Sequence, residues 1–267
     1  MLELQNGYML NGDCLELMKD IADKSIDMIL TDLPYGTTAC KWDTIIPFEP
    51  LWEQYKRIIK DNGAIVLFGA EPFSSYLRMS NIKEYRYDWT WIKNRSGGAV
   101  SAACKPLSCV ENISVFYQKQ PTYNAIMVER SEKELSKLSK NSTCFNSDEN
   151  GVGFNKEYIQ NRDNLKLKYP RRDIYIPTVF NRSKEKCDHP TQKPVALFEY
   201  LIKTYTNEGK LVLDNCSGSG TTAIACINTN SNYICIEKYE TYFNKSVERL
   251  NNHVRIKNNR IITELPL

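Results

Sequence analysis

Short apolar runs of strand type alternate with amphipathic stretches along most of the chain. Apolar or alternating runs predict strands at 8–10, 26–31, 64–68, 85–93, 113–118, 211–214 and 233–237. Apolar residues at helical spacing predict helices at 14–22, 47–59, 72–79, 195–205, 221–228 and 239–254. This alternation is typical of an α/β protein with a largely parallel, doubly wound sheet.

One region, residues 119–188, breaks this rhythm. It is rich in Asn, Lys, Ser and Tyr, and only a polar helix at 131–140 stands out in it. Residues 118–185 carry 13 Lys/Arg against 9 Asp/Glu, although the net charge of the whole chain is only +3. A solvated, loop-rich insert and a surface for phosphate contact both fit this composition. The glycine-containing stretch at 94–108 is expected to be a mobile loop within a hairpin at the far edge of the sheet.

The predicted strand at 26–31 stops abruptly at a carboxylate. Asp32 follows the apolar run, and Pro34 and Gly36 come soon after it, which prevents the strand from continuing. Ligands of open α/β sheets bind at the carboxyl ends of strands. Asp32 and Tyr35 are therefore candidates for an active-site edge, whereas each alone fits a turn cap or a core aromatic equally well.

A second strand, at 211–214, also ends at a carboxylate, Asp214. The residues that lead from it into the next helix are Asn215, Cys216, Ser217, Gly218, Ser219 and Gly220. Glycines allow a ligand to approach the backbone, and the following helix N-terminus favours an anion. Glu237 ends the next strand, where an acid can accept hydrogen bonds from ribose hydroxyls. The loop lacks the third glycine of dinucleotide sites and the Gly-Lys-Ser/Thr of P-loops, which disfavours both.

Together these motifs resemble those of the amino-methylating DNA methyltransferases. Asp32-Leu33-Pro34-Tyr35 resembles the family's Asp-Pro-Pro-Tyr motif, with Leu33 at the first proline, and Ser217–Thr222 resembles its S-adenosylmethionine loop. His189-Pro190-Thr191-Gln192-Lys193-Pro194, by itself a plain helix-entry turn, resembles its cofactor-flanking motif. The order of catalytic motif, insert and cofactor motif is that of the family's beta group, in which the target-recognition region lies between the other two.

The resemblance implies a Rossmann-like S-adenosylmethionine-dependent methyltransferase fold. Its parts would be a catalytic half at 1–118, a target-recognition insert at 119–188 and a cofactor-binding half at 189–267. The residues expected to bind S-adenosylmethionine are Asp13, Cys14, Asp32, Thr191, Lys193, Asp214, Cys216, Ser217, Gly218, Ser219, Gly220, Thr221, Thr222 and Glu237. By the same resemblance, the Asp13 carboxylate would bind the adenine ring of the cofactor, and the anion at the helix N-terminus would be its methionine carboxylate.

Asp32, Leu33, Pro34 and Tyr35 are the expected catalytic residues. The exocyclic amine of a base is a poor nucleophile because its lone pair is delocalised into the ring. Asp32 and the backbone carbonyl of Leu33 would each accept one amine hydrogen, and Pro34 would hold that carbonyl in place. Tyr35 would stack on the base once it has been flipped out of the duplex. Direct in-line transfer from the sulfonium then requires alignment rather than a metal or a covalent nucleophile.

The expected substrate is the N6 amine of adenine at a specific site in double-stranded DNA, because family members that act on cytosine often carry Ser at the Asp32 position. Cytosine N4, RNA, a protein glutamine amide and a catalytically silent DNA-binding module are the alternatives. Candidate DNA contacts, each also compatible with a solvated basic face, are Arg95, Lys105, Lys166, Lys168, Arg171 and Arg172. A homodimer and a separate cognate restriction endonuclease are further partners that the family suggests, and a solitary methylase fits as well.

The cysteine content changes this picture little. Nine cysteines without a Cys-x-x-Cys pair, and only two histidines, disfavour a zinc site. Cys216, Cys226 and Cys235 lie in small or apolar surroundings and are expected to be buried thiols of a reducing cytoplasm.

No apolar run approaches the roughly 20 residues that span a bilayer. A cytoplasmic protein without a membrane partner is therefore expected.

Overall fold

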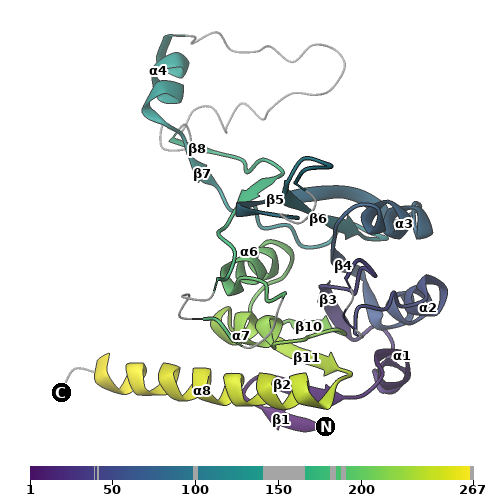
Figure 1. The fold of residues 1–267 in the computed structure, drawn as a ribbon. Coiled ribbons are helices and arrows are strands. Elements are labelled where there is room, and N and C mark those ends of the chain that lie inside the picture. Colours follow the sequence, from purple (N-terminus) through teal and green to yellow (C-terminus); the bar gives the residue numbers. More distant parts are fainter. Residues whose placement is uncertain are drawn as a thin grey trace. The chain divides into compact units, whose positions relative to one another are not determined.

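The structure is a computed structural model that describes residues 1–38, 40, 42–98, 102–140, 166–180, 185–187 and 191–264. The chain forms two compact units, one made of Met1–Asn124 with Arg172–Leu267 and the other of Ala125–Arg171. Within the described residues, the first unit holds a large mixed sheet and the second a small two-stranded sheet (Figure 1).

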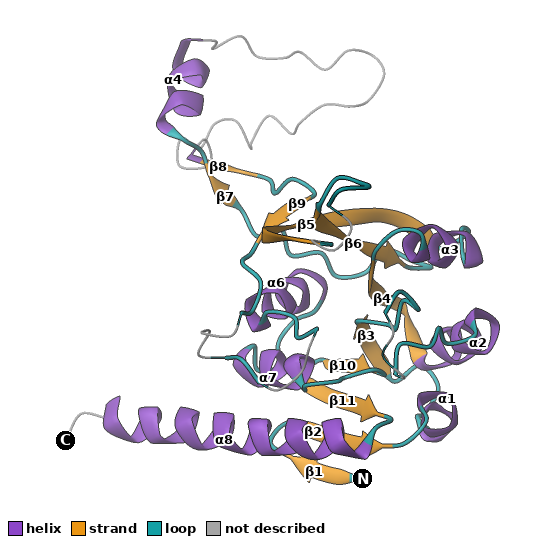
Figure 2. Cartoon of the chain, viewed as in Figure 1, coloured by secondary structure: helices purple, strands orange, loops and turns teal. Residues whose placement is uncertain are grey.

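The sheet of the first unit has nine strands in the described residues, in the order β1-β2-β11-β10-β3-β4-β6-β5-β9 (Figure 2). These strands are β1 Leu2–Leu4, β2 Gly7–Asn11, β3 Ile26–Thr31, β4 Ile59–Gly69, β5 Tyr85–Gly97, β6 Ser108–Phe116, β9 Asp173–Tyr175, β10 Leu211–Asp214 and β11 Asn232–Glu237. Strands β2, β11, β10, β3 and β4 are parallel, whereas β1 and β6 run antiparallel to these neighbours. From the centre, β3 leads outward to β4 and β10 leads the other way to β11. The topological switch point, where such sheets bind ligands, therefore lies between β3 and β10.

Helices cover both faces of this sheet. They are α1 Cys14–Leu17, the 3-10 helix η1 Met18–Asp20, α2 Phe48–Ile58, α3 Phe73–Ser80, α6 Val195–Tyr205, α7 Thr221–Asn228 and α8 Glu240–Glu264. Buried side chains of α1, α2 and α3 pack on one face, and those of α6, α7 and α8 pack on the other. The doubly wound α/β architecture is thus as the sequence predicts.

Local sequence explains why the central elements form where they do. Pro47 precedes the first turn of α2, and Leu51, Tyr55 and Ile58 place the apolar face of this helix in the core. The residues at 64–68 in β4 are buried without exception, as a parallel strand covered on both faces requires. The sequence pattern and the burial therefore agree at the strands that carry the switch point.

Several boundaries differ from the prediction. The elements at 195–205, 211–214 and 221–228 are confirmed to the residue. Strand β4 begins at Ile59, however, and not at residue 64 as predicted, so Gly63 lies inside the strand. The register of β3 against β4 shifts here, and a Cβ on Gly63 would lie 2.9 Å from the backbone oxygen of Asp27. This glycine therefore allows the two backbones to approach closely at an irregular strand pair.

The hairpin of β5 and β6 is longer than predicted and does not lie at the edge. Strand β5 continues to Gly97 and β6 begins at Ser108, which shortens the loop predicted at 94–108. Strand β9, which follows the second unit in sequence, pairs with β5 and becomes the edge strand. Its three residues carry too weak a pattern to be recognised as a strand in the sequence.

The residues that flank the second unit in sequence, Asn124 and Arg172, are hydrogen-bonded within the first unit. Before it, the backbone nitrogen of Asn124 donates to the Thr204 carbonyl at 2.8 Å, and the Asn124 side chain donates to the Thr206 carbonyl at 2.9 Å. After it, the Arg172 carbonyl accepts from the Thr90 nitrogen at 2.7 Å. The predicted insert at 119–188 thus includes the second unit together with flanking segments that belong to the first.

The second unit contains β7 Val128–Glu129, β8 Leu167–Lys168 and α4 Glu132–Lys140. Ser131 and Glu134 form a reciprocal capping box at the start of α4, with the Ser131 nitrogen donating to Glu134 at 2.8 Å. Lys168 on β8 pairs with Glu134 at 2.6 Å. Hydrogen bonding to Lys168 and Ser131 lowers the pKa of Glu134 to about 2.

The remaining sequence expectations concern thiols and membranes. Cys226 and Cys235 are buried as expected, but Cys216 is only half-buried because it lines a cavity. The cysteines in the described part of the chain are free thiols. No helix among the described residues is long and apolar enough to cross a membrane.

Candidate active site

The loops that follow β3 and β10 meet at the switch point. At the end of β3, the Thr31 hydroxyl bridges to the side chains of Asp214 at 3.2 Å and Asn215 at 3.0 Å. The Tyr55 hydroxyl of α2 donates to the same Asn215 oxygen at 2.6 Å. These buried hydrogen bonds hold the carboxyl ends of the two strands side by side.

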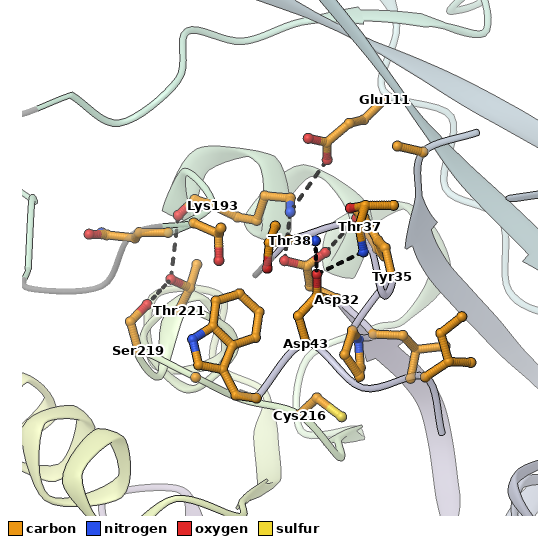
Figure 3. Close-up of a pocket in the computed structure, with 18 of the residues that line it drawn as sticks. Asp32, Tyr35, Thr37, Thr38, Asp43, Glu111, Lys193, Cys216, Ser219 and Thr221 are labelled. Atoms are coloured by element: carbon orange, nitrogen blue, oxygen red, sulfur yellow. Dashed lines mark hydrogen bonds and ion pairs between the residues drawn. The ribbon is translucent and has the colours of Figure 1, made fainter. Parts of the chain in front are cut away.

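A cavity of about 1200 Å³ opens between the two loops (Figure 3). That volume exceeds the roughly 300–1,000 Å³ of an ordinary small-molecule site, so the cavity has room for a nucleoside cofactor and a second planar group. The predicted site residues that line it are Asp13, Cys14, Asp32, Leu33, Pro34, Tyr35, Lys105, Thr191, Lys193, Asp214, Cys216, Ser217, Gly218, Ser219, Thr221, Thr222 and Glu237. Motifs that are far apart in the sequence are thus brought to one cavity.

The glycine loop after β10 is held in shape from two sides. Gly218 has φ +49° and donates its backbone N–H to Glu237 at 2.8 Å, while the second Glu237 oxygen accepts from the Tyr239 nitrogen at 2.8 Å. Burial raises the pKa of Glu237 despite these hydrogen bonds. Gly220 has φ +73° and caps α7, whose first residues line the cavity, although Gly220 itself does not.

Arg249 of α8 supports this loop from behind, which the sequence did not indicate. Its half-buried guanidinium donates to the Ser219 carbonyl at 2.8 Å and to the Thr221 hydroxyl at 3.2 Å. Burial lowers the pKa of Arg249. The arginine is therefore part of the frame of the loop rather than of the cavity surface.

Asp13 and Asp214, the two outer acids of the predicted cofactor set, have different surroundings. Asp13 caps α1 through the Leu15 nitrogen at 3.0 Å and pairs with Lys238 at 3.0 Å, and the hydrogen bond to Lys238 lowers its pKa. Asp214 is buried and accepts from the Cys216 nitrogen and the Thr222 hydroxyl. Burial raises the pKa of Asp214 to about 7. Asp13 is accessible at the cavity rim, whereas Asp214 mainly holds the loop together.

Asp32 lies at the centre of a group of polar side chains. One carboxylate oxygen accepts from the Tyr35 hydroxyl at 2.6 Å, and the other is 2.6 Å from the Lys193 ammonium. Burial raises the pKa of Asp32 even though Lys193 opposes this. Burial alone would lower the pKa of Lys193, but Asp32 and Glu111 together raise it. Lys193, predicted among the cofactor residues, thus lies directly on the predicted catalytic carboxylate (Figure 3).

Glu111 of β6 is a cavity residue that the sequence analysis missed. Its Oε2 is 3.3 Å from the Lys193 ammonium, and its Oε1 contacts Lys93 of β5. No clear signal in the sequence indicates it, because Glu111 lies outside the predicted strand at 113–118, in a part of β6 that also carries Asn112 and Ser114.

Leu33 and Tyr35 have apolar surroundings that bear on their predicted roles. The Leu33 side chain is buried in the core with α2, which explains why an apolar residue suits this position. The Tyr35 ring stacks on Phe73 with a centroid separation of 5.1 Å, and Lys193 lies 5.6 Å from its centroid. One face of the tyrosine is therefore occupied by the protein itself.

The loop after Tyr35 is fastened by a second acid, Asp43, which the sequence analysis also missed. The Asp43 carboxylate accepts three backbone N–H groups, those of Gly36 at 2.8 Å, Thr37 at 2.9 Å and Thr38 at 2.6 Å. Burial would raise the pKa of Asp43, but these hydrogen bonds lower it. Because Thr37 and Thr38 line the cavity, Asp43 determines the position of one of its walls.

Asp43→Asn is expected to loosen this wall, because an amide presents N–H groups where the carboxylate now accepts three. The loss of charge-assisted hydrogen bonds predicts a fall in stability of about 1–3 kcal/mol and a roughly tenfold or larger loss in kcat/KM for methyl transfer. Thermal unfolding and steady-state kinetics measure the two effects. The exposed Asp61→Asn is the matched control, and an Asp43 variant as active as the control would contradict the assigned role.

The predicted DNA contacts are distributed over both units. In the first unit, Arg95 lies over the Phe180 ring at 5.0 Å, Lys105 lines the cavity and Arg172 pairs with Asp88 at 3.3 Å. In the second unit, Lys168 pairs with Glu134, while Lys166 and Arg171 are exposed. Of the predicted cofactor-flanking motif, His189 and Pro190 lie outside the described residues.

Comparison with known proteins places these features in a family. The DNA methylase family model of N6/N4 methyltransferases matches residues 26–248. The type II methyltransferase M.HpaI of Haemophilus parainfluenzae is 27% identical over 252 residues, which cover 90% of this chain and 72% of that protein. The DNA adenine methyltransferase YhdJ of Escherichia coli is 26% identical over 256 residues, which cover 91% and 82%.

Solved structures share the fold. A complex of M1.HpyAVI with SAM superimposes with a TM-score of 0.61 at 24% identity and covers 92% of this chain and 99% of that one. The cytosine-N4-specific PvuII DNA methyltransferase gives a TM-score of 0.65 at 17% identity, with 98% and 94% covered. The fold is that of the Rossmann-like S-adenosylmethionine-dependent methyltransferases. The family match over most of the chain, with both motifs at one cavity, shows that this protein belongs to the amino-methylating DNA methyltransferases.

Proposed function

We propose that this protein transfers a methyl group from S-adenosylmethionine to the N6 amine of adenine at a specific site in double-stranded DNA. The observation that carries the proposal is the position of Asp32 and the glycine loop on one cavity. The first supplies an acceptor for an amine, and the second supplies the backbone of a cofactor site. Asp32 and the glycine loop lie close together because they follow β3 and β10, the two adjacent strands on either side of the switch point.

Residues of the cofactor half fit S-adenosylmethionine by their chemistry. The N-terminus of α7 would attract the methionine carboxylate, and Glu237 would accept hydrogen bonds from the ribose hydroxyls. Asp13 at the rim would face the adenine ring. When bound, the cofactor supplies a sulfonium whose methyl group is strongly electrophilic.

The chain's own residues prepare the amine that is to be methylated. Asp32 and the Leu33 carbonyl would each accept one amine hydrogen, which directs the nitrogen lone pair away from the ring system and towards the methyl group. Pro34 limits the movement of that carbonyl. Tyr35 would stack on the flipped base through the face that Phe73 does not cover.

Adenine is proposed over cytosine because the motif begins with Asp32 and not with Ser. The relatives include both types, since YhdJ is named a DNA adenine methyltransferase and the PvuII enzyme is cytosine-N4-specific. We propose residues 119–188, with Lys166 and Arg171, for target recognition. Action on DNA inside a cell places the protein in the cytoplasm, as a solitary methylase or beside a separate restriction endonuclease.

The test is methyl transfer from labelled S-adenosylmethionine to unmethylated bacterial genomic DNA, followed by nucleoside mass analysis. N6-methyl-2′-deoxyadenosine in the product is the expected result, and mapping its positions gives the recognised sequence. Label in N4-methylcytosine would move the target to cytosine. No label in DNA, from a protein that binds the cofactor, would overturn the proposal and direct the search to RNA and protein amides.

A further inference from the structure

The cavity holds more charge than the proposed transfer requires. Next to Asp32 it contains a second acid, Glu111, and two ammonium groups, Lys193 and Lys93, that form ion pairs with these carboxylates. Only Asp32 has a role in the chemistry described so far. Glu111 and the two lysines therefore need a separate explanation, since buried charges are costly without one.

The ammonium on Asp32 conflicts with methyl transfer. Both Asp32 oxygens already accept a hydrogen bond, one from Tyr35 and the other from Lys193. A base amine that enters the site must share one of these oxygens with the present donor or displace that donor. In addition, positive charge passes from the sulfonium to the amine nitrogen during transfer, and an ammonium beside Asp32 opposes this. The carboxylate stabilises the reaction best when Lys193 has moved away.

Glu111 offers Lys193 a second position within the same cavity. Its Oε2 lies 3.3 Å from the Lys193 ammonium, yet it is buried without a hydrogen-bond partner in the described residues. A small rotation at the end of the Lys193 side chain would exchange the Asp32 contact for a hydrogen bond to this oxygen. Lys93 contacts the other Glu111 oxygen and keeps the carboxylate in place.

We propose that Glu111 is a positioning residue that receives the Lys193 ammonium when the base amine reaches Asp32. In the free enzyme Lys193 neutralises Asp32, and in the complex with DNA it neutralises Glu111. The total charge of the four side chains is thus the same in both states. Lys193 leaves the Asp32 carboxylate only when the base amine takes the place of the ammonium. This inference rests on the proposed function of the cavity.

Glu111→Gln is the variant that tests it, because it keeps the shape and removes the charge that would hold Lys193. We expect kcat for DNA methylation to fall about 10- to 100-fold, with the KM for S-adenosylmethionine unchanged. Glu111 raises the pKa of Asp32 in the native enzyme. Its replacement should therefore move the acid limb of the kcat/KM profile to lower pH, even though the enzyme is slower.

Two further variants separate positioning from a structural role. Lys93→Gln breaks the ion pair between Lys93 and Glu111 but leaves the Glu111 carboxylate, so it should lower kcat much less than Glu111→Gln does. Glu199→Gln, on α6 and away from the cavity, is the control for a charge change of the same kind. Glu111→Asp should restore part of the rate.

The outcomes are distinct. Native kinetics in Glu111→Gln, or equal losses in Glu111→Gln and Lys93→Gln with an unmoved acid limb, would overturn the role of Glu111 while the proposed function stands. A native protein that binds the cofactor but methylates no DNA would overturn the proposed function itself, and the inference with it.

Discussion

Asp32→Ala is expected to reduce kcat for DNA methylation by about 1000-fold or more, the scale at which a buried charge acts on a transition state. The substitution removes the acceptor of one amine hydrogen and the charge that stabilises the developing cation. Folding should survive, because Lys193 keeps Glu111 as its partner at 3.3 Å. Affinity for S-adenosylmethionine should change by less than about tenfold, since the glycine loop is untouched.

Labelled-methyl transfer, cofactor titration and thermal unfolding together measure these three effects. Asp32→Asn keeps the shape of the side chain and an oxygen acceptor but removes the charge, so it should be slow but faster than the alanine variant. Because burial raises the pKa of Asp32, native activity should also decline on acidification at a pH above the usual carboxyl range. An alanine variant with a tenth of native activity would remove Asp32 from the mechanism.

Gly220→Ala is expected to damage both stability and cofactor binding. At φ +73° an alanine is strained, and its Cβ would lie 2.8 Å from Leu250 and 3.1 Å from Ser246 of α8. Strain and overpacking together should cost about 2–4 kcal/mol. Relief of the contacts moves the start of α7 relative to the loop, so the Kd for S-adenosylmethionine should rise tenfold or more.

The chain offers an unusually well matched control for this change. Gly209 has φ +74°, and a Cβ there meets nothing within 4 Å. Gly209→Ala therefore carries the same backbone strain, about 1–2 kcal/mol, without the contact with α8. Calorimetric unfolding and isothermal titration of both variants separate the effect of backbone strain from the effect of the contact with α8. Equal losses in the two variants would show that helix packing against Gly220 has no effect on the cofactor loop.

The central elements were predictable because their signals are local. Continuous stretches of sequence encode the apolar strands that precede Asp32 and Asp214. The same holds for the glycine loop between Asp214 and α7. The prediction of the cavity followed from the rule that such strands end at one edge of a sheet. Strand β9 was not predictable, since its three residues are a strand only because β5 offers them an edge.

The parts of the site that were missed depend on contacts between distant residues. Glu111 lies on β6, and only the folded sheet brings it to Lys193. Asp43 lies between the predicted strand at 26–31 and the predicted helix at 47–59. Its role comes from a turn that directs three backbone N–H groups towards its carboxylate. The resemblance assigned Lys193 to the cofactor half, whereas its terminal nitrogen reaches the catalytic half. Side-chain direction, rather than sequence position, decides such cases.

The hydrogen bonds of Asn124 and Arg172, the first-unit residues that flank the second unit in sequence, have an evolutionary consequence. Asn124 and Arg172 each form a main-chain hydrogen bond, to the Thr204 carbonyl and the Thr90 nitrogen respectively, and these bonds fix the two ends of the first unit between which the second unit is inserted. Main-chain hydrogen bonds do not depend on which side chains the attached segment carries. A lineage can therefore exchange the whole segment between these points, by recombination or rapid divergence, while the sheet, the cavity and the chemistry are inherited unchanged.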